Sequence, residues 1–397
     1  MIQLSMKRSF CFLSLLFLLT SCFKDEPKNM ECDILEAWVE GDDLSSHFFQ
    51  QSDMRIANVP SDVHQLAFTV KSQAELPLLK VFFSITPGAT IVPANGSAQD
   101  FSKGPVVYTV TSEDGAYSRR YTVSFTNPAK PAVEESKMKF DFEHYELNKD
   151  EKTVRSNRYY VWYEESADGS RNDNVWATGN GGFILAKPNA QPEDYPSVAD
   201  ANGYEGACVR LTTRDTGSWG QTFKKPIAAG NLFFGEFDPQ FAFTNTLLTT
   251  KMGIPFDEEP TKVTGYYKYR PGEVFTDKDG LEHKDRVDAP SIYAVFYRNQ
   301  NARGEKVVLH GDDIRTNELI VSMAEVAELP ATDEWKPFEM TFKSQAPVNA
   351  EQLKNRGYSM ALVFSSSKTG DEFVGAVGST LYIDKVEITF KPKEENQ

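Results

Sequence analysis

Short segments in which apolar and polar residues alternate, each closed by turn residues, constrain the fold of this chain most. In HQLAFTVKS (64–72), Leu66, Phe68 and Val70 occupy every second position, which is the period of a strand with one buried face. Similar segments recur along most of the 397 residues, whereas the two helical patterns, TNELIVSMAEV (316–326) and NAEQLKNRG (349–357), are short. The sequence therefore predicts an all-β fold.

A first module is predicted over residues 33–127. Pro87-Gly88, Asn95-Gly96 and Asp114-Gly115 separate its strand candidates. The last of these dipeptides predicts a hairpin between VVYTVTSE and RRYTVSF. Short strands in this number and spacing predict an immunoglobulin-like β-sandwich.

A second and larger module is predicted over residues 138–392, after a proline-containing linker at 128–137. Its strand candidates include KFDFEHYEL, YYVWYEE, GACVRLTT, VTGYYKYR, SIYAVFYR, WKPFEMTF, YSMALVFSS and TLYIDKVEITF. Their number and the length of the module predict a two-sheet jelly roll. Tyr and Phe occupy both faces of several strands, which is more than one core needs.

Residues 1–22 are predicted to be a bacterial lipoprotein signal peptide. Lys7 and Arg8 precede the apolar run 10–19, which is too short for a permanent membrane span. The run ends in LTSC, which resembles a lipobox, so Cys22 is the predicted lipidation site. The alternative is an ordinary secretory signal followed by a chance cysteine.

Residues 23–32 are expected to tether the first module to the acylated cysteine. Lys24-Asp25-Glu26 resembles the surface-export signal of Bacteroidetes lipoproteins, although acidic runs are also common on any solvated surface. The resemblance implies an outer-membrane protein, held by lipid, that faces the cell exterior.

The formal net charge of −15 limits the classes of partner. It argues against nucleic acid, whose phosphates need clustered Lys and Arg, and against an acidic polysaccharide held by charge alone. A neutral sugar or another protein remains. Cys32 lies at the end of the predicted tether and Cys208 lies in the second module, so a disulfide is not favoured, and the five His show no zinc-site spacing.

The glycine-rich stretch SSSKTGDEFVGAVGST (365–380) raises the question of a phosphate-binding loop. Gly370 and Gly375 have the right spacing, but Ala376 and Val377 stand where Lys and Ser or Thr are required. A strand, not a helix, follows Gly378. The glycines are therefore expected to allow a tight excursion between two strands.

Several blocks of the second module together resemble one protein family. They are VWATGNGGF (175–183), PFDEEPTKVTGYYKYRPGEVF (255–275), SIYAVFYR (291–298) and FSSSKTGDEFVGAVGSTLYIDKVEITF (364–390). The family is the putative carbohydrate metabolism domain of Bacteroidetes lipoproteins. Likewise, the stretch from SITPGATIVPANGSAQDF to DGAYSRRYTVSF resembles small spacer sandwiches at the N-termini of such lipoproteins. The resemblance implies a carbohydrate-related function beside glycan-uptake machinery, without naming a mechanism.

Two carboxylates resemble the ligands of a structural calcium in carbohydrate-binding jelly rolls. Glu143 lies in an early DFE segment, and Asp384 lies in the late segment YIDKV. The resemblance implies that the two meet at a buried Ca²⁺, whose shell of 6–8 oxygens would need backbone carbonyls as well. The alternative is that both carboxylates face solvent at strand ends.

Two loop-like runs, NDNVWATGNGG and RDTGSWGQ, supply candidate sugar-binding residues. Sugars are held by aromatic faces and by hydrogen bonds from Asn, Asp and Arg. The predicted ligand-binding residues are Asn174, Trp176, Asn180, Arg214, Asp215 and Trp219. A loop Trp that only anchors local packing is the competing interpretation.

A glycoside hydrolase would need two carboxylates across a cleft. The candidates are Glu164, Glu165, Asp173, Asp215, Glu236 and Asp238, but no spacing singles out a pair among 57 acidic residues. The chain has no Gly-x-Ser-x-Gly nucleophile elbow, so a Ser-His-Asp mechanism is not indicated either.

The sequence thus predicts a surface lipoprotein whose second module captures a glycan, expected to be neutral. A glycoside hydrolase acting through two carboxylates is the first alternative. A structural or adhesive surface protein is the second.

Overall fold

A computed structural model describes residues 28–41, 44–72, 76–127, 136–149, 158–166, 169–242 and 245–392. The predicted signal peptide, Cys22 and most of the predicted linker lie outside these residues. The chain divides into two compact units. The first comprises residues up to Leu44, Met54–Phe68 and Ser72–Thr126, and the second comprises Ser45–Asp53, Thr69–Lys71 and the chain from Asn127 onward.

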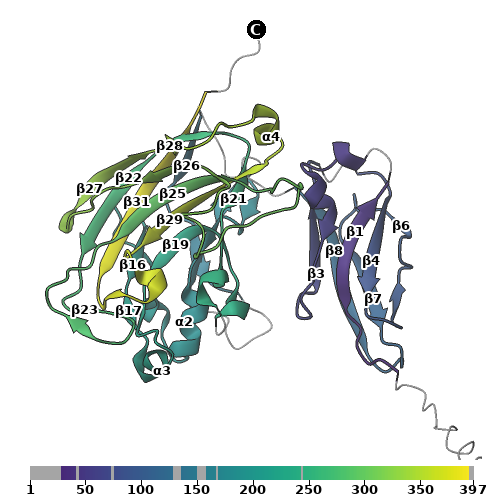
Figure 1. Ribbon diagram of the computed structural model, residues 1–397, viewed down its shortest axis with the longest axis horizontal. Coiled ribbons are helices and arrows are strands. Elements are labelled where there is room, and N and C mark those ends of the chain that lie inside the picture. Colours follow the sequence, from purple (N-terminus) through teal and green to yellow (C-terminus); the bar gives the residue numbers. More distant parts are fainter. Residues whose placement is uncertain are drawn as a thin grey trace, which may run out of the picture. The chain divides into compact units, whose positions relative to one another are not determined.

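The N-terminal unit is an immunoglobulin-like sandwich of two four-stranded sheets (Figure 1). One sheet has the order β2-β1-β4-β6, with β1 (Ile34–Glu40), β2 (Arg55–Ile56), β4 (Leu79–Ile85) and β6 (Ala98–Gln99). The other has the order β3-β8-β7-β5, with β3 (Gln65–Thr69), β5 (Thr90–Val92), β7 (Val106–Thr111) and β8 (Ser118–Thr126). Short 3-10 turns are η1 (Leu44–Ser46) and η2 (Gln51–Met54).

Alternation explains how these strands pack. Leu66, Phe68 and Val70 are buried, as their spacing predicts. The predicted hairpin joins β7 to β8, and Gly115 takes the positive φ of +72° that its turn requires.

The C-terminal unit is a jelly-roll-like sandwich built on an eight-stranded and a six-stranded sheet. The larger sheet contains β14 (Trp176–Ala177), β19 (Asn231–Phe237), β20 (Thr250–Met252), β21 (Ile254–Phe256), β25 (Ser291–Arg298), β26 (Ile320–Glu325), β28 (Lys343–Ser344) and β29 (Tyr358–Ser365). The smaller contains β9 (Lys137–Phe140), β15 (Ser197–Asp200), β16 (Cys208–Thr212), β22 (Pro260–Arg270), β27 (Thr332–Thr341) and β31 (Thr380–Phe390).

Short strands and helices connect these two sheets. The additional pairings are β10 (Tyr145–Leu147) with β11 (Tyr160–Trp162), β12 (Glu164–Glu165) with β13 (Arg171–Asn172), β17 (Arg214–Asp215) with β18 (Ile227–Ala228), and β23 (Phe275–Thr276) with both β24 (Glu282–His283) and β30 (Gly375–Ala376). The helices are α2 (Asn180–Ala186), α3 (Gly217–Thr222) and α4 (Ala350–Lys354), with 3-10 turns η3 (Pro192–Asp194), η4 (Pro239–Phe241), η5 (Thr246–Thr249) and η6 (Gly370–Glu372).

Of the two helical patterns in the sequence, only one forms a helix. The pattern at 349–357 yields α4, whose first turn is capped by the Asn349 side chain accepting from the Gln352 amide. The pattern at 316–326 forms strand β26 instead. Its residues Ile320, Val321 and Ala324 are buried in the sheet, so tertiary packing overrides the local periodicity.

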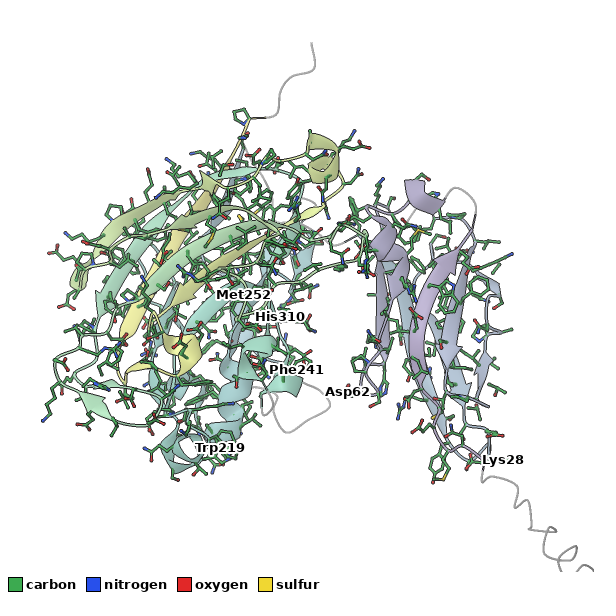
Figure 2. The ribbon with its side chains drawn as sticks, in the orientation of Figure 1. Lys28, Asp62, Trp219, Phe241, Met252 and His310 are labelled. Atoms are coloured by element: carbon green, nitrogen blue, oxygen red, sulfur yellow. The ribbon has the colours of Figure 1, made fainter. Side chains whose placement is uncertain are left out.

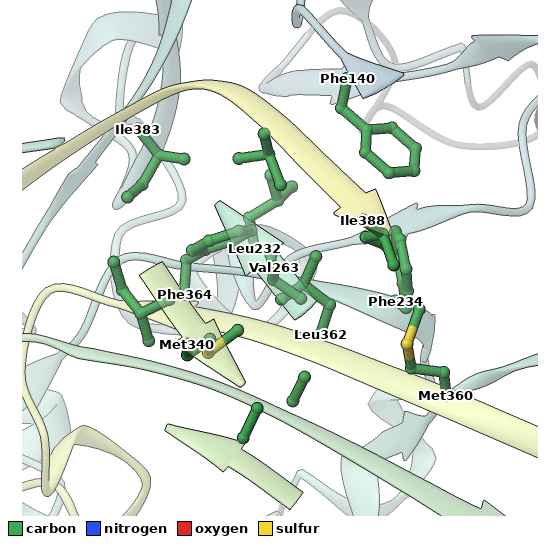
Figure 3. Close-up of a cluster of buried hydrophobic side chains, with 14 of the residues drawn as sticks. Phe140, Leu232, Phe234, Val263, Met340, Met360, Leu362, Phe364, Ile383 and Ile388 are labelled. Atoms are coloured by element: carbon green, nitrogen blue, oxygen red, sulfur yellow. The ribbon is translucent and has the colours of Figure 1, made fainter. Parts of the chain in front are cut away.

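The main core lies between the two sheets of the C-terminal unit. Figure 3 shows Leu232, Leu362 and Phe364 from the larger sheet among Val263, Ile383 and other residues of the smaller one. The opposite face of the larger sheet is also apolar and buried. This second buried face accounts for the aromatic residues on both sides of the strands, and it is where the candidate site lies. None of the described helices is long and apolar enough to cross a membrane.

Candidate functional site

A cavity of about 220 Å³ lies on the outer face of the eight-stranded sheet. Its floor is made by outward-facing residues of three neighbouring strands, Phe233 of β19, Tyr293 of β25 and Val363 of β29. The walls come from connecting segments, namely α2, α3, the region of η4 and η5, and the glycine-rich stretch after β29. We call this space the main cavity.

Aromatic side chains form much of the lining of the main cavity. Trp219 lies in α3, with its ring centroid 4.8 Å from that of Phe223. Figure 2 labels Trp219 near one end of the unit and Met252, another lining residue, closer to its middle. Phe237 and Phe373 also line the space. Such rings can stack on the C–H faces of a sugar.

The glycine-rich stretch forms one wall, and the buried carboxylate of Asp288 holds it. Asp288 Oδ2 accepts hydrogen bonds from Ser367 Oγ at 2.6 Å, Ser379 Oγ at 2.7 Å and the Ala376 amide at 2.7 Å. Phe373 reaches the cavity from a positive φ of +62°. The stretch is therefore an excursion between β29 and β31, as expected, and not a phosphate loop.

The charged lining residues are Lys225, Arg315, Lys368 and Asp371. Asp371 is the one acid among the described residues that line the main cavity. Burial raises the pKa of its carboxyl group, and neighbouring Glu372 adds to that increase. Burial lowers the pKa of the Lys225 ammonium. Arg315 and Lys368 both contact Glu325, at 2.6 Å and 3.5 Å.

Of the six predicted ligand-binding residues, only Trp219 lines the main cavity. Trp176 lies in strand β14, not in a loop, and is 6% exposed. Its ring packs against Phe140 and Phe234 in the core, with centroid separations of 5.1 and 4.5 Å. The ring therefore serves local packing on these sides, while Trp176 also lines a smaller cavity of about 160 Å³ together with Tyr159 and Phe237. A role of Trp176 in sugar binding stays a prediction.

Asn180 is fully buried and has a structural role. Its amide group bonds both the carbonyl and the amide of Ser197, at 2.8 and 3.1 Å, which ties α2 to β15. Asp215 is exposed and pairs with Lys187 at 2.9 Å. Arg214 donates to the Glu193 carbonyl at 3.0 Å, and Asn174 is exposed. These four residues lie outside the lining of the main cavity.

None of the six candidate hydrolytic carboxylates lines the main cavity either. Asp173 and Asp238 form ion pairs with Arg171 and Lys251, and Glu165 and Glu236 are exposed. Glu164 differs from the rest. Burial raises the pKa of its carboxyl group to about 8, although the Trp176 Nε1–H group donates to Glu164 Oε1 at 2.7 Å.

Glu143 and Asp384 converge on one loop, residues 203–207, between β15 and β16. Asp384 Oδ2 accepts from the amides of Tyr204 and Glu205 at 2.7 and 3.1 Å, and Glu143 Oε1 accepts from the Ala207 amide at 2.9 Å. Asp384 is fully buried, so the interpretation that both carboxylates simply face solvent is wrong for this residue. Among the described residues, no group of three or more His, Cys, Asp or Glu side chains is arranged to hold a metal.

Comparison with known families identifies the family of each part of the chain. Residues 141–389 match the model of the putative carbohydrate metabolism domain. The chain belongs to this family. Residues 46–125 match the N-terminal domain of surface glycan-binding proteins. Both matches agree with the resemblances in the sequence, and no match was found among curated proteins.

Two crystal structures of relatives align with much of this chain. One, described as a putative glycoside hydrolase from Bacteroides thetaiotaomicron, is 33% identical, covers 93% of this chain and 100% of its own, and has a TM-score of 0.68. The other, a putative glycoside hydrolase from Bacteroides vulgatus, is 38% identical, covers 64% of this chain and 98% of its own, and has a TM-score of 0.57.

Sequence reasoning missed Lys225, Phe373 and Asp371 as members of the site. All three lie in connecting segments, where no period or spacing marks a residue as inward-facing. Tyr293, on the cavity floor, had a usable signal, because β25 is apolar at nearly every position and must therefore have two buried faces.

Proposed function

We propose that this protein captures a glycan at the cell surface and that the main cavity is its binding site. The observation that carries the proposal is a concave space lined by Trp219, Phe237, Tyr293 and Phe373 together with polar side chains, in a chain of a carbohydrate-related family. The match to surface glycan-binding proteins supports the same function for the chain as a whole.

Capture fits the charges of the main cavity better than hydrolysis does. Hydrolysis of a glycosidic bond uses two carboxylates on opposite sides of the bond. Asp371 is the single acid among the described lining residues. One carboxylate can bond a sugar hydroxyl group, but it does not make a catalytic pair.

The first experiment is a glycan-array screen of residues 28–397 with product analysis of every hit. Trp219→Ala should weaken binding by up to roughly tenfold, because a stacked aromatic contact contributes about 0.5–1.5 kcal/mol. Trp335→Ala is the matched control, since Trp335 lies on β27 away from the cavity lining. Equal binding by wild type and Trp219→Ala would argue against this cavity, and no binding to any glycan would argue against capture.

The relatives described as putative glycoside hydrolases keep hydrolysis as a second candidate, and Glu164 is the residue that favours it. Its pKa of about 8 would keep the carboxyl group protonated at neutral pH, as a general acid requires. If the array hits are cleaved, Glu164→Gln should abolish product release while binding remains. Cleavage that is unchanged in Glu164→Gln would exclude this residue as the acid.

We further propose that Cys22 is acylated and anchors the protein in the outer membrane beside glycan-uptake machinery. The support is the lipobox-like LTSC and the surface glycan-binding domain that follows. Cys22→Ala should move the protein from the membrane to the soluble fraction, and intact cells should lose it from their surface. Retention of the variant in the outer membrane would contradict the lipid anchor.

A structural calcium at Glu143 and Asp384 is also proposed. A Cβ atom on Gly203 would lie 2.7 Å from the carbonyls of Gly206 and Ala207 and from Asp384 Oδ2, so carboxylate and carbonyl oxygens crowd one side of this loop. That donor set fits Ca²⁺, which takes oxygen ligands. Added calcium should raise the melting temperature of wild type but not of Asp384→Asn. Identical melting with calcium and with a chelator would show that the carboxylates serve backbone amides alone.

A further inference from the structure

The strongest unexplained group in the main cavity is the ammonium of Lys225. Its Nζ donates to the Ala242 carbonyl at 2.8 Å and to Thr246 Oγ1, both neutral acceptors. It also lies 5.4 Å from the centroid of the Phe373 ring, another lining residue. An ammonium has three N–H donors, so one remains for a further acceptor.

The other cations of the cavity have acidic partners, whereas Lys225 has none among the residues that the structure describes. Arg315 and Lys368 share the carboxylate of Glu325, and Arg315 also covers the ring of Tyr293 at 4.4 Å. No carboxylate of the described residues forms an ion pair with Lys225 within 4.0 Å. A cation that is partly removed from water without a counter-ion is costly, and a bound anion would offset that cost.

The net charge of the lining is opposite in sign to that of the chain. Three cations and one acid line the main cavity, and Glu325 pairs with two of the cations, so the lining with this partner keeps one net positive charge while the whole protein carries −15. Local positive charge of this kind selects anionic groups even on an acidic protein. The expectation of a neutral glycan was based on the charge of the whole chain, which does not describe this cavity.

We propose that the main cavity recognises an anionic sugar, with Lys225 binding its carboxylate or sulfate group. The proposal rests on glycan capture in this cavity and names the class of glycan. The ammonium provides a charge-assisted hydrogen bond, while Trp219 and Phe373 contact the apolar faces of the ring. A uronic acid and a sulfated sugar share this chemistry, and the experiment distinguishes them.

The test is an array of uronate-containing, sulfated and neutral glycans, in which each acidic hit is compared with its own modified copy. Carboxyl reduction converts a uronic acid into its neutral sugar, and desulfation removes the sulfate while the backbone stays the same. We expect at least a roughly tenfold loss of wild-type affinity on one of these treatments, the loss expected for a charged hydrogen bond. Which treatment causes the loss identifies the anionic group.

Variants then test whether Lys225 is the residue that binds the anionic group. Lys225→Gln should bind the acidic glycan and its neutral copy equally, and Lys225→Arg should restore part of the difference. Lys268→Gln is the matched control, because Lys268 also lies over an aromatic ring, Trp335 at 4.6 Å, but outside the lining. If Lys225→Gln does not fold, the comparison of native and modified glycans on wild type still decides the proposal.

The remaining outcomes separate the two proposals. Binding of neutral glycans alone, or equal affinity for acidic and modified copies, would overturn the anionic-sugar proposal and leave capture intact. A loss on modification that Lys225→Gln does not change would also overturn it, since the anion would then bind elsewhere. Absence of any binding would overturn glycan capture itself.

Discussion

Trp176 and Trp219 occupy different environments in the same unit. Both follow polar, glycine-containing segments, and both are predicted as sugar platforms. The Trp176 ring is enclosed by core phenylalanines and its Nε1–H group is used by Glu164, whereas Trp219 lies on a six-residue helix at the cavity wall. The difference is set by neighbours far away in sequence, so local composition could not separate them.

At the residue scale, Glu164 should make stability depend on pH. Its folded pKa of about 8 exceeds the ordinary value of 4.5, so between these values the folded protein holds a proton that the unfolded chain has released. Stability from this group is therefore complete below pH 4.5 and is lost as the pH rises through about 8. Urea unfolding at several pH values should show a flatter profile for Glu164→Gln than for wild type. Superimposable profiles would contradict the raised pKa.

At the scale of elements, the wall at 365–379 is the part of the site that the sequence describes best. Its residues do not match a phosphate-binding loop, and a strand follows them, so the sequence predicts an excursion between two strands. The structure confirms this prediction. The role of Asp288 could not be predicted, because this carboxylate is distant in sequence from Ser367 and Ser379 and meets them only in the folded sheet.

Removing Asp288 should destabilise this wall. Asp288→Ala leaves the buried hydroxyls of Ser367 and Ser379 and the Ala376 amide without their acceptor. We expect a loss of about 2–4 kcal/mol in the free energy of unfolding, measured by urea denaturation, together with weaker glycan binding. Asp285→Ala, three positions earlier on an exposed site, is the control. A loss no larger than that of the control would show that the network carries little stability.

Some features of the strands could be predicted from the local sequence, and others depend on residues far away in the chain. Alternation located most strands of both units, and the turn dipeptides located the β7–β8 hairpin. Alternation could not assign β26, whose period suits a helix, nor could it say which segments would cover the outer face of the larger sheet. Those outcomes depend on contacts between elements far apart in the chain.

At the scale of the whole molecule, the chain divides into two compact units, and the proposed site belongs to the second of them. Calorimetric unfolding should therefore show two transitions, and a saturating glycan should raise only that of the C-terminal unit, because a ligand stabilises the unit that binds it. Binding-induced shifts in both transitions would contradict this assignment. A single unfolding transition that shifts as a whole on glycan binding would also contradict this assignment.

The main cavity lies outside a sandwich that is already closed by its own core, and its walls are loops and short helices. Substitutions there leave the pairing of the sheets unchanged. Under the proposed function, the sugar that the cavity accepts can therefore change through substitutions in a few connecting segments while the strands stay the same. Glycan preference should accordingly be inherited less faithfully among relatives than the fold.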